Sequence, residues 1–415
     1  MSEQKKTNIV TIVCIILLLV VALFTTYNLF LKKDNPKAKK TVVDEVKEEH
    51  YEAKVIAVGD SLIHSSVYKD ANRHANGGYL NLGTGQYNFS PMYTNIKNIV
   101  ADYDIAYYNQ ETILGGTELG LSDYPLFNSP YQAGDGMLDA GFNLVSLATN
   151  HTADFGVRGI NNSCKYWNSK EDVLTAGSYC SEEERNEIRI KEVNNIKYTM
   201  LNYTYGTNGM PVSNYYNVNV WPTNGSGPDN DYYYNEYKKT VKEDIDRVRD
   251  KVDVLIVAMH WGVEYTHTPT AYEFDMAKYL ASLGVDVIIG THPHVIQPVT
   301  WIDNTLVIYS LGNFISAQYQ NYSTCTYYKC TVGLMTNFTI EKDVKDGKTS
   351  IKIKDVENEL IYNYYNQASW NGFKIIPFSN PEIANYLPGY KNVYNTYKEV
   401  VQRYNETMPV VPVAE

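Results

Sequence analysis

Short runs of apolar, often β-branched residues recur along the chain after residue 50, and most of them end in Gly, Asn, Asp or His. Apolar runs bounded by turn residues are typical of buried strands. The predicted strands span residues 54–60, 103–111, 142–151, 196–203, 252–260, 285–289 and 307–314. Helical spacing lies between several of them, at 161–186, 236–251 and 272–283. This alternation predicts an α/β fold with a largely parallel or mixed sheet and an active centre along one rim.

The C-terminal part of the chain shows a different pattern. Residues 331–340 and 350–356 form two β-rich runs with Asp346-Gly347 between them. Asp-Gly between two such runs is typical of a tight turn, so we expect an antiparallel hairpin. Residues 390–404 predict a C-terminal helix followed by a frayed tail. Residues 204–237 are rich in Gly, Asn, Pro and Tyr and predict a long loop, of the kind that often forms a lid or binding surface.

The N-terminal region is almost unbroken apolar sequence from Ile9 to Phe24 and stays weakly polar to Leu31. This is long enough to cross ~30 Å of hydrocarbon as a helix. A cleaved signal peptide is the alternative, but no small-x-small cleavage site follows the run. We therefore expect a short tail at 1–8, a transmembrane anchor at 9–31, a solvated linker at 32–52, a globular domain at 53–378 with core motifs at 54–316, and a C-terminal helix and tail at 379–415.

The orientation of the anchor is predicted differently by its lysines and by the cysteines. Two lysines precede the apolar run and five follow it: Lys5 and Lys6, then Lys32, Lys33, Lys37, Lys39 and Lys40. By the positive-inside rule this favours a cytoplasmic domain. Outside the anchor, Cys164 with Cys180 and Cys325 with Cys330 form two local pairs that could close as disulfides in an oxidising compartment. Four unrelated reduced thiols are the alternative.

The charge of the chain excludes one class of partner. Its formal net charge is −11 and its pI is about 5.3. Nucleic-acid binding needs clustered Lys and Arg, so we expect no nucleic-acid partner.

Polar residues that suit metal binding stand at the ends of several predicted strands. They are Asp60, Glu111, Asn150, His260, His292 and His294, and His151 follows one of them directly. Each has an ordinary alternative: Asp60 could cap a helix, Glu111 could be solvated, Asn150-His151 could form an Asx turn, and His292-Pro293-His294 could be a structural turn. Because the residues recur at one strand end after another, these alternatives would all have to hold together.

Carboxylates, an amide and imidazoles suit borderline divalent ions such as Mn²⁺, Zn²⁺ or Fe²⁺ better than Ca²⁺ or Mg²⁺. Two such ions ~3.5–4 Å apart can activate a water and clamp the oxygens of a displacement at phosphorus. We therefore expect metal-dependent hydrolysis of a phosphoester. His151 would protonate the leaving oxygen or stabilise charge on the phosphoryl group.

The ordered motifs resemble those of the CapA family. They are Gly59-Asp60, Asn109-Gln110-Glu111, Asn150-His151 with Asp154 and Gly156, His260-Trp261-Gly262-Val263-Glu264-Tyr265, Gly290-Thr291-His292-Pro293-His294 and Tyr309-Ser310-Leu311-Gly312-Asn313-Phe314. The resemblance implies a membrane-anchored protein of capsular poly-γ-glutamate biosynthesis, with the four-layer α/β/β/α sandwich of the calcineurin-like metallophosphoesterases. It also implies an extracytoplasmic main domain, metal ligands at the six positions above and a catalytic His151.

Several further expectations accompany the resemblance. Site-adjacent or substrate-contacting roles are expected for His64, Asn109, Trp261, Glu264, Tyr265 and Asn313. The partners expected are the membrane, the capsule polymer and other membrane subunits of a synthesis or export complex. The wider superfamily usually opens with Asp-x-His, whereas Leu62 stands two residues after Asp60, which points to one metal site that is incomplete, weak or differently built. A metal-binding scaffold without catalysis is the alternative to the enzyme.

Overall fold

The computed structural model describes residues 3–31, 48–222, 227–318 and 324–415. The chain divides into two units, Met1–Lys47 and Glu48–Glu415. The predicted linker therefore falls mostly outside the described residues. Its last part, residues 48–52, is not linker: it begins strand β1 (Glu48–Ser61), because pairing with a neighbouring strand continues to Glu48 opposite Lys345.

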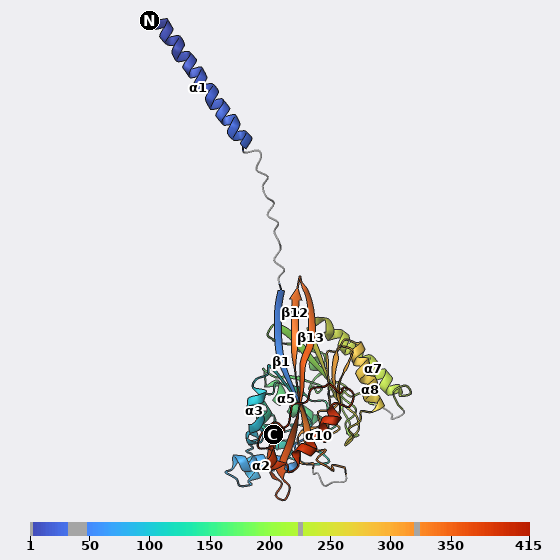
Figure 1. The fold of residues 1–415 in the computed structure, drawn as a ribbon. Coiled ribbons are helices and arrows are strands. Elements are labelled where there is room, and N and C mark those ends of the chain that lie inside the picture. The colour runs from blue at the N-terminus through green and yellow to red at the C-terminus, as the bar shows by residue number, and fades with distance from the viewer. Residues whose placement is uncertain (1–2, 32–47, 223–226, 319–323) are drawn as a thin grey trace. The chain divides into compact units, whose positions relative to one another are not determined.

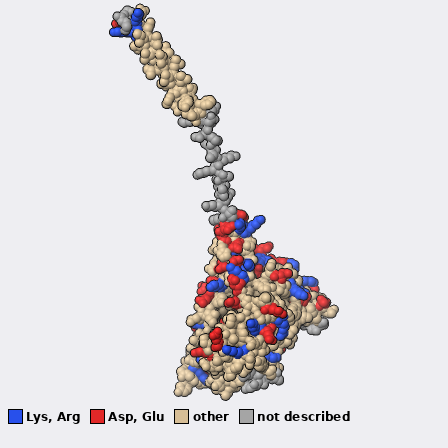
Figure 2. Space-filling view, in the orientation of Figure 1, with Lys and Arg blue, Asp and Glu red and all other residues tan. Residues whose placement is uncertain are grey.

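The N-terminal unit contains one long helix, α1 (Glu3–Leu31). It is long and apolar enough to cross a membrane, a property that anchors and signal sequences share. Figure 2 shows its surface as uncharged along most of its length, whereas acidic and basic groups are interspersed over the globular unit. The structure thus contains a candidate membrane helix where the sequence predicts one.

The globular unit is built on two sheets. The first has eight strands in the order β14-β13-β12-β1-β2-β3-β4, with β11 also pairing with β1. Their bounds are β1 (Glu48–Ser61), β2 (Ile105–Gln110), β3 (Leu144–Ser146), β4 (Leu174–Ala176), β11 (Asn313–Ile315), β12 (Val332–Lys345), β13 (Lys348–Asn366) and β14 (Asn371–Pro377). Strands β1 to β4 are parallel, whereas β12, β13 and β14 continue the sheet antiparallel. The long strands β1, β12 and β13 run together as a ribbon (Figure 1).

The second sheet has six strands in the order β5-β6-β7-β8-β10-β9. Their bounds are β5 (Lys191–Val193), β6 (Ile196–Thr204), β7 (Val254–His260), β8 (Val287–Thr291), β9 (Val299–Ile302) and β10 (Thr305–Ile308). The four central strands are parallel, and β5 and β9 pair antiparallel at the two edges. Each central strand therefore ends at the same rim of the sheet.

Helices cover the outer faces of the two sheets, and the two C-terminal helices pack with the apolar cluster between the sheets. The helices are α2 (Ser65–Ala75), α3 (Thr94–Val100), α4 (Gln132–Asp139), α5 (Gly156–Asn168), α6 (Glu182–Asn186), α7 (Tyr232–Val248), α8 (Ala271–Ser282), α9 (Ile383–Tyr386) and α10 (Tyr390–Val401), with short 3₁₀ turns at Leu82–Thr84, Ser90–Tyr93, Thr117–Leu119 and Arg249–Lys251. One apolar cluster joins residues of α2, α3, α4 and α5 to the first sheet, and another joins α7 and α8 to the second. A third lies between the sheets. These layers confirm the predicted α/β/β/α sandwich.

The alternation of side chains along a strand explains the layering. In β7, Ile256 and Ala258 belong to the cluster between the sheets, whereas Leu255 and Val257 belong to the cluster under α7 and α8. Successive side chains point to opposite faces of a sheet, so a strand that is apolar throughout is buried on both sides.

Two expectations about the C-terminal part are corrected by the structure. The predicted strand at 307–314 is split, because β10 ends at Ile308 in the second sheet and β11 starts at Asn313 in the first. The last residues are not frayed: Met408 is buried, and the N–H of Ala414 donates to the carbonyl of Phe378 at 2.9 Å. The predicted hairpin is confirmed as β12 and β13, with Asp346 and Gly347 at positive φ in its turn.

The cysteines behave differently in their two pairs. Cys325 and Cys330 form a disulfide, as predicted. Cys164 and Cys180 do not: both are free thiols, although their sulfurs lie within 4.8 Å of each other. The Cys180 thiol faces the carbonyl of Asn161 at 3.8 Å, and a hydrogen bond between the two thiols takes the place of the expected covalent bond.

Candidate metal centre

The predicted site residues come from both sheets and meet at the carboxyl ends of their parallel strands. Asp60 lies near the end of β1, and Glu111 directly follows β2. His260 is the last residue of β7, and His292 directly follows β8. The site therefore lies where the rims of the two sheets face each other.

A single segment holds the two rims together. The N–H of Asp60 donates to the carbonyl of Gly312 at 2.9 Å, and the N–H of Leu311 donates to the carbonyl of Gly290 at 3.1 Å. Residues 309–312 thus bond to a strand of each sheet. The approach requires glycine, since a Cβ on Gly290 would lie 1.8 Å from the carbonyl oxygen of Tyr309.

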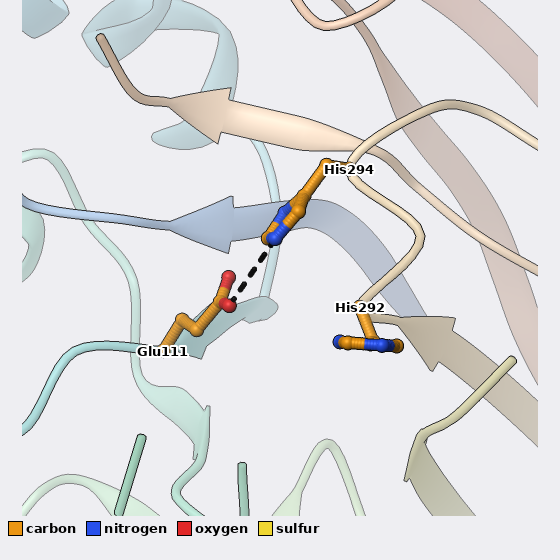
Figure 3. Close-up of side chains that lie close together, drawn as sticks. All are labelled: Glu111, His292 and His294. Atoms are coloured by element: carbon orange, nitrogen blue, oxygen red, sulfur yellow. Dashed lines mark ion pairs between the residues drawn. The ribbon is translucent and has the colours of Figure 1, made fainter. Parts of the chain in front are cut away.

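Glu111, His292 and His294 form a compact group of potential metal ligands. One ligand atom of each lies within 4.8 Å of the others, and all three residues are buried. His294 Nε2 lies 3.6 Å from Glu111 Oε1 (Figure 3). Among the described residues, the two carboxylate oxygens of Glu111 have no hydrogen-bond partner, and the Nδ1 of His292 has none either. Buried polar atoms without partners are rare and need an explanation such as an ion.

The two histidines of the loop are held in unusual backbone conformations. His292 has φ 97° and His294 has φ 57°. Positive φ is uncommon for residues with a side chain, and such strain collects at functional sites because the surroundings must enforce it. Here Asp60 Oδ2 accepts the N–H of His292 at 3.3 Å, which ties the loop to the first sheet.

The electrostatics of the site are unbalanced without a cation. Burial, and then the neighbouring imidazoles, lower the pKa values of His260 and His292 well below the usual value. Burial raises the pKa of Glu111, an effect opposed by His294 and reinforced by Asp60. Burial also lowers the pKa of His294, but the carboxylates of Glu111 and Asp60 outweigh it and bring the pKa to about 9. A proton on His294 thus carries the positive charge that the carboxylates require.

The remaining predicted ligands pair with one another. His260 Nε2 donates to Asn150 Oδ1 at 2.9 Å, and Thr291 Oγ1 lies 3.0 Å from His260 Nδ1. A neutral imidazole has one N–H, so Thr291 donates to the other ring nitrogen. Asp60 lies 3.2 Å from His294 Nδ1.

Asn109 is placed as a bridge between the two sheets. Its amide donates to Asp60 Oδ1 at 2.9 Å and lies 3.4 Å from His260 Nδ1. Its oxygen accepts the hydroxyl of Ser146 at 2.6 Å. Asn109 therefore orients other site residues, which refines the expected site-adjacent role.

His151 stands beside this group with its own carboxylate. His151 Nδ1 lies 2.7 Å from Asp154 Oδ2, which also accepts the backbone N–H of Phe127. The Phe127 ring packs edge-on against the imidazole at 4.7 Å. The carboxylate fixes the Nδ1–H tautomer and leaves Nε2 for other contacts.

Three of the six residues expected near the site are found there in addition to Asn109. Asn313 Oδ1 accepts His294 Nδ1 at 3.1 Å, and Glu264 Oε1 lies 3.8 Å from His294 Nε2. The Tyr265 and His294 rings are 6.0 Å apart. His64 does not join the ligand group: its ring packs against Phe127, its Nδ1 accepts the N–H of Ala317, and burial lowers its pKa to about 4.

Trp261 adjoins the site through its backbone N–H, which donates to the carbonyl of Thr291 at 3.1 Å, but its side chain faces away from the site. Its side chain is fully buried in the cluster under α7 and α8, and its Nε1 donates to the carbonyl of Tyr309 at 2.9 Å. Trp261 follows His260 at the strand end, and neighbouring side chains point to opposite faces. Since His260 faces the site, Trp261 faces the helices.

Sequence reasoning missed three residues at the site. Tyr205, directly after β6, places its ring 4.5 Å from that of His292. It obeys the same strand-end rule as the histidines, so that rule could have found it. Thr291 hydrogen-bonds to His260, and Phe127 packs against His151. No local sequence pattern predicts that Phe127 lies at the site.

The donor set fits a divalent ion. Glu111 offers two free carboxylate oxygens, and His292 and His294 offer imidazoles, a mixture that suits Mn²⁺, Zn²⁺ or Fe²⁺. Together with the sheets, this defines an α/β sandwich protein with a metal-capable group between its two rims.

Comparison with known proteins identifies the family. The family described as "Bacterial capsule synthesis protein PGA_cap" matches residues 54–318, and the chain belongs to this family. It is 28% identical over 181 residues to the PGA biosynthesis protein CapA of Bacillus subtilis (strain 168), and 28% identical over 188 residues to the capsule biosynthesis protein CapA of Bacillus anthracis. Each match covers 43% of this chain, and 44% and 41% of the respective relatives. The chain thus matches less than half the length of these relatives.

Two solved structures resemble the chain at low identity. One is described as GAP50, the anchor in the inner membrane complex of Plasmodium, with a TM-score of 0.31, 10% identity, and coverage of 74% of this chain and 90% of that one. The other is the 5'-nucleotidase from Candida albicans SC5314, with a TM-score of 0.38, 11% identity, and coverage of 84% and 57%.

Proposed function

We propose that this chain is a membrane-anchored, metal-dependent hydrolase that cleaves a phosphoester during synthesis or export of capsular poly-γ-glutamate or a related surface polymer. The observation that carries the proposal is Glu111, a buried carboxylate with neither oxygen hydrogen-bonded, beside two imidazoles from the other sheet. The capsule context comes from the family, and two relatives bear names of capsule biosynthesis.

The proposed cofactor is a pair of Mn²⁺, Zn²⁺ or Fe²⁺ ions. The proposed ligands are Asp60, Glu111, Asn150, His260, His292 and His294. Bound ions of this kind would supply polarisation of phosphoryl oxygens and activation of a water. The three-residue group of Glu111, His292 and His294 is the better supported site, because the other ligands already hydrogen-bond within the protein.

His151 is the proposed proton donor. Asp154 accepts its Nδ1–H, which holds the ring in one orientation and leaves Nε2 to face the substrate. Phe127 packs against the ring and keeps water from that side. The group best suited to receive the proton is the oxygen that leaves when the phosphoester is cleaved.

The proposal is tested by His151→Ala in the Mn²⁺-loaded full chain, with phosphomonoester and phosphodiester substrates. We expect kcat to fall by about 10²–10⁴-fold while bound metal, measured by elemental analysis, is unchanged. His50→Ala is the matched control, because His50 is an exposed histidine on β1. Unchanged hydrolysis by His151→Ala would remove the assigned role.

The second candidate is a metal-binding scaffold without turnover. One observation favours it: Leu62 occupies the position at which the wider superfamily carries a ligand, and His64 is engaged with Ala317 instead. The scaffold predicts that the wild-type chain binds metal yet hydrolyses no ester, and that cells carrying His151→Ala still export polymer.

The proposed location is the cell membrane, with α1 as an uncleaved anchor and the main domain extracytoplasmic. The Cys325–Cys330 disulfide supports it, since disulfides persist in oxidising compartments. Protease treatment of intact cells tests it: digestion of the globular unit is expected, and complete protection would place the domain inside.

A further inference from the structure

A cavity of about 740 Å³ is lined in part by Tyr265, whose ring lies 6.0 Å from that of His294. Its lining includes His64, Lys69, Arg73, Asp123, Tyr265 and Gln318. Lys69 and Arg73 come from α2, whereas the other walls come from loops. The cavity is large enough for a small organic group.

Side-chain contacts connect this cavity directly to the site. Asn313 Nδ2 donates to Gln318 Oε1 at 2.7 Å, and the same Asn313 accepts a hydrogen bond from His294. Gln318 in turn donates to the hydroxyl of Tyr265 at 3.3 Å. A substrate held at the site would therefore extend into the cavity along this wall.

The opposite wall reaches the proposed proton donor. The ring of His64 lies 5.3 Å from that of Phe127, and the Phe127 ring lies 4.7 Å from that of His151. Phe127 thus lies between His64 of the cavity and the proposed proton donor, so the cavity and His151 lie toward the same side of the site.

Two cations line the cavity without partners. Lys69 and Arg73 are four residues apart and so share one face of α2. Neither side chain makes a hydrogen bond or ion pair among the described residues, and Arg73 Nη1 is buried without an acceptor. The chain as a whole carries a net charge of −11, so a general excess of cations does not explain the pair.

The one carboxylate in the cavity lining is already engaged. Asp123 Oδ1 accepts the N–H of Tyr124 at 2.8 Å. Burial acts to raise the pKa of Asp123, but hydrogen bonds with Ser65 and Tyr124 hold it below its usual value. The carboxylate is therefore ionised and satisfied by its own neighbours, which leaves the charges of Lys69 and Arg73 for a ligand.

We propose that this cavity binds the leaving-group side of the substrate, and that Lys69 and Arg73 hold a carboxylate or phosphate there. The preferred substrate then carries a second anionic group remote from the phosphoester. A guanidinium offers a bidentate fork to either anion, and a lysine adds a point charge. The catalytic part of this inference rests on the proposed hydrolase, whereas the binding part does not.

The test uses alkyl phosphate monoesters of equal length that end in a carboxylate, a phosphate or a neutral carboxamide. With the Mn²⁺-loaded full chain, we expect KM for the anionic tails to be about tenfold lower than for the carboxamide, with similar kcat. The double variant Lys69→Gln/Arg73→Gln should raise KM for the anionic tails and so remove the difference from the carboxamide. Lys197→Gln, an exposed lysine on β6, is the matched control.

Binding of the corresponding non-hydrolysable phosphonates, measured by calorimetry, separates this inference from the proposed function. A tail preference that the double variant loses supports the cavity assignment even when no ester is hydrolysed, and only the hydrolase then fails. Equal affinity for all three tails, or a preference that survives in the double variant, overturns the assignment. Tighter binding of one anionic tail than the other identifies which anion the cavity takes.

A folding defect would not hide the result. If circular dichroism shows that the double variant is unfolded, the single variant Lys69→Gln replaces it, because Lys69 is partly exposed and makes no hydrogen bond or ion pair with the described residues. It should lose about half of the logarithmic preference. No loss in a folded Lys69→Gln chain would contradict the role given to Lys69.

Discussion

The two sheets contribute opposite chemistry to one site. Among the proposed metal ligands, the first sheet supplies the carboxylates and the amide, from the end of β1 and the segments that follow β2 and β3. The second sheet supplies the imidazoles, from the end of β7 and the loop that follows β8. On its own, the first set would hold two repelling carboxylates. The second would hold three buried imidazoles, of which His294 lowers the pKa values of the other two. Each set is therefore unfavourable alone, and the two are complementary only across the interface between the sheets.

The largest effect is expected from separating the two sheets at their joining segment. Gly290→Ala would place a Cβ 1.8 Å from the carbonyl oxygen of Tyr309. We expect the free energy of unfolding, from urea titration, to fall by about 4 kcal/mol or more. Gly83→Ala is the control, since its Cβ would meet its nearest neighbour at 3.4 Å and change stability by within about 0.5 kcal/mol. Equal stability of the two variants would contradict the close approach.

The next effect sharpens the contrast between carboxylate and imidazole. In the metal-free protein, His294→Ala leaves Asp60 and Glu111 without their shared cation and should lower the free energy of unfolding by about 3 kcal/mol. Glu111→Gln removes a buried carboxylate without hydrogen bonds and should raise the free energy of unfolding by about 1 kcal/mol.

Both variants should nevertheless lose metal. Elemental analysis after Mn²⁺ loading would show this loss. Opposite changes in the free energy of unfolding of the metal-free variants would indicate that Glu111 serves metal binding and not stability. Equal destabilisation of the metal-free protein by both variants would contradict this prediction. It would show that Glu111 stabilises the fold although its oxygens have no hydrogen-bond partner among the described residues.

A smaller effect is expected from loss of the disulfide, which packs beside the loop that carries His294. Cys325 and Cys330 pack with Val295, directly after His294, and with Tyr265. The five-residue separation closes a short loop, so Cys325→Ser/Cys330→Ser should lower the free energy of unfolding by about 2 kcal/mol. Reduction of the wild-type chain should reproduce the loss, and an unchanged urea midpoint would show that the loop is held without the bond.

The smallest effect concerns the orientation of His260. Thr291→Val removes the hydroxyl beside His260 Nδ1 at 3.0 Å, and we expect metal affinity, measured by calorimetry, to fall about tenfold. Thr305→Val is the control. Thr305 starts β10, away from the site, and its buried hydroxyl donates to the carbonyl of Val285. Equal affinities of the two variants would show that His260 is oriented by other contacts.

Much of this arrangement is predictable from strand ends. Apolar runs that stop at Asp60, Glu111, His260 and His292 reveal the residues, because parallel strands end at one rim. The pattern of apolar runs alone predicts one sheet, however. The second sheet was predicted only from the resemblance to a family. Pairing between distant strands leaves no local signal, which is why the split between β10 and β11 was missed.

Alternation within a strand would have predicted the direction of one side chain. In β7, odd-numbered residues such as Val257 and Met259 face the helices, so Trp261 continues that series. By contrast, Phe127 and Gln318 reach the site or its cavity through loops, and loop paths do not follow from periodicity. The site was thus predictable where regular strands carry it, and not where loops do.

The central claim is that one metal ion is held by ligands from both sheets, and an anomalous diffraction map of Mn²⁺-loaded crystals tests it most directly. The account predicts an anomalous peak within coordination distance of Glu111 from the first sheet and of His292 and His294 from the second. A fully loaded crystal with no peak there, or with a peak coordinated from one sheet alone, would contradict it.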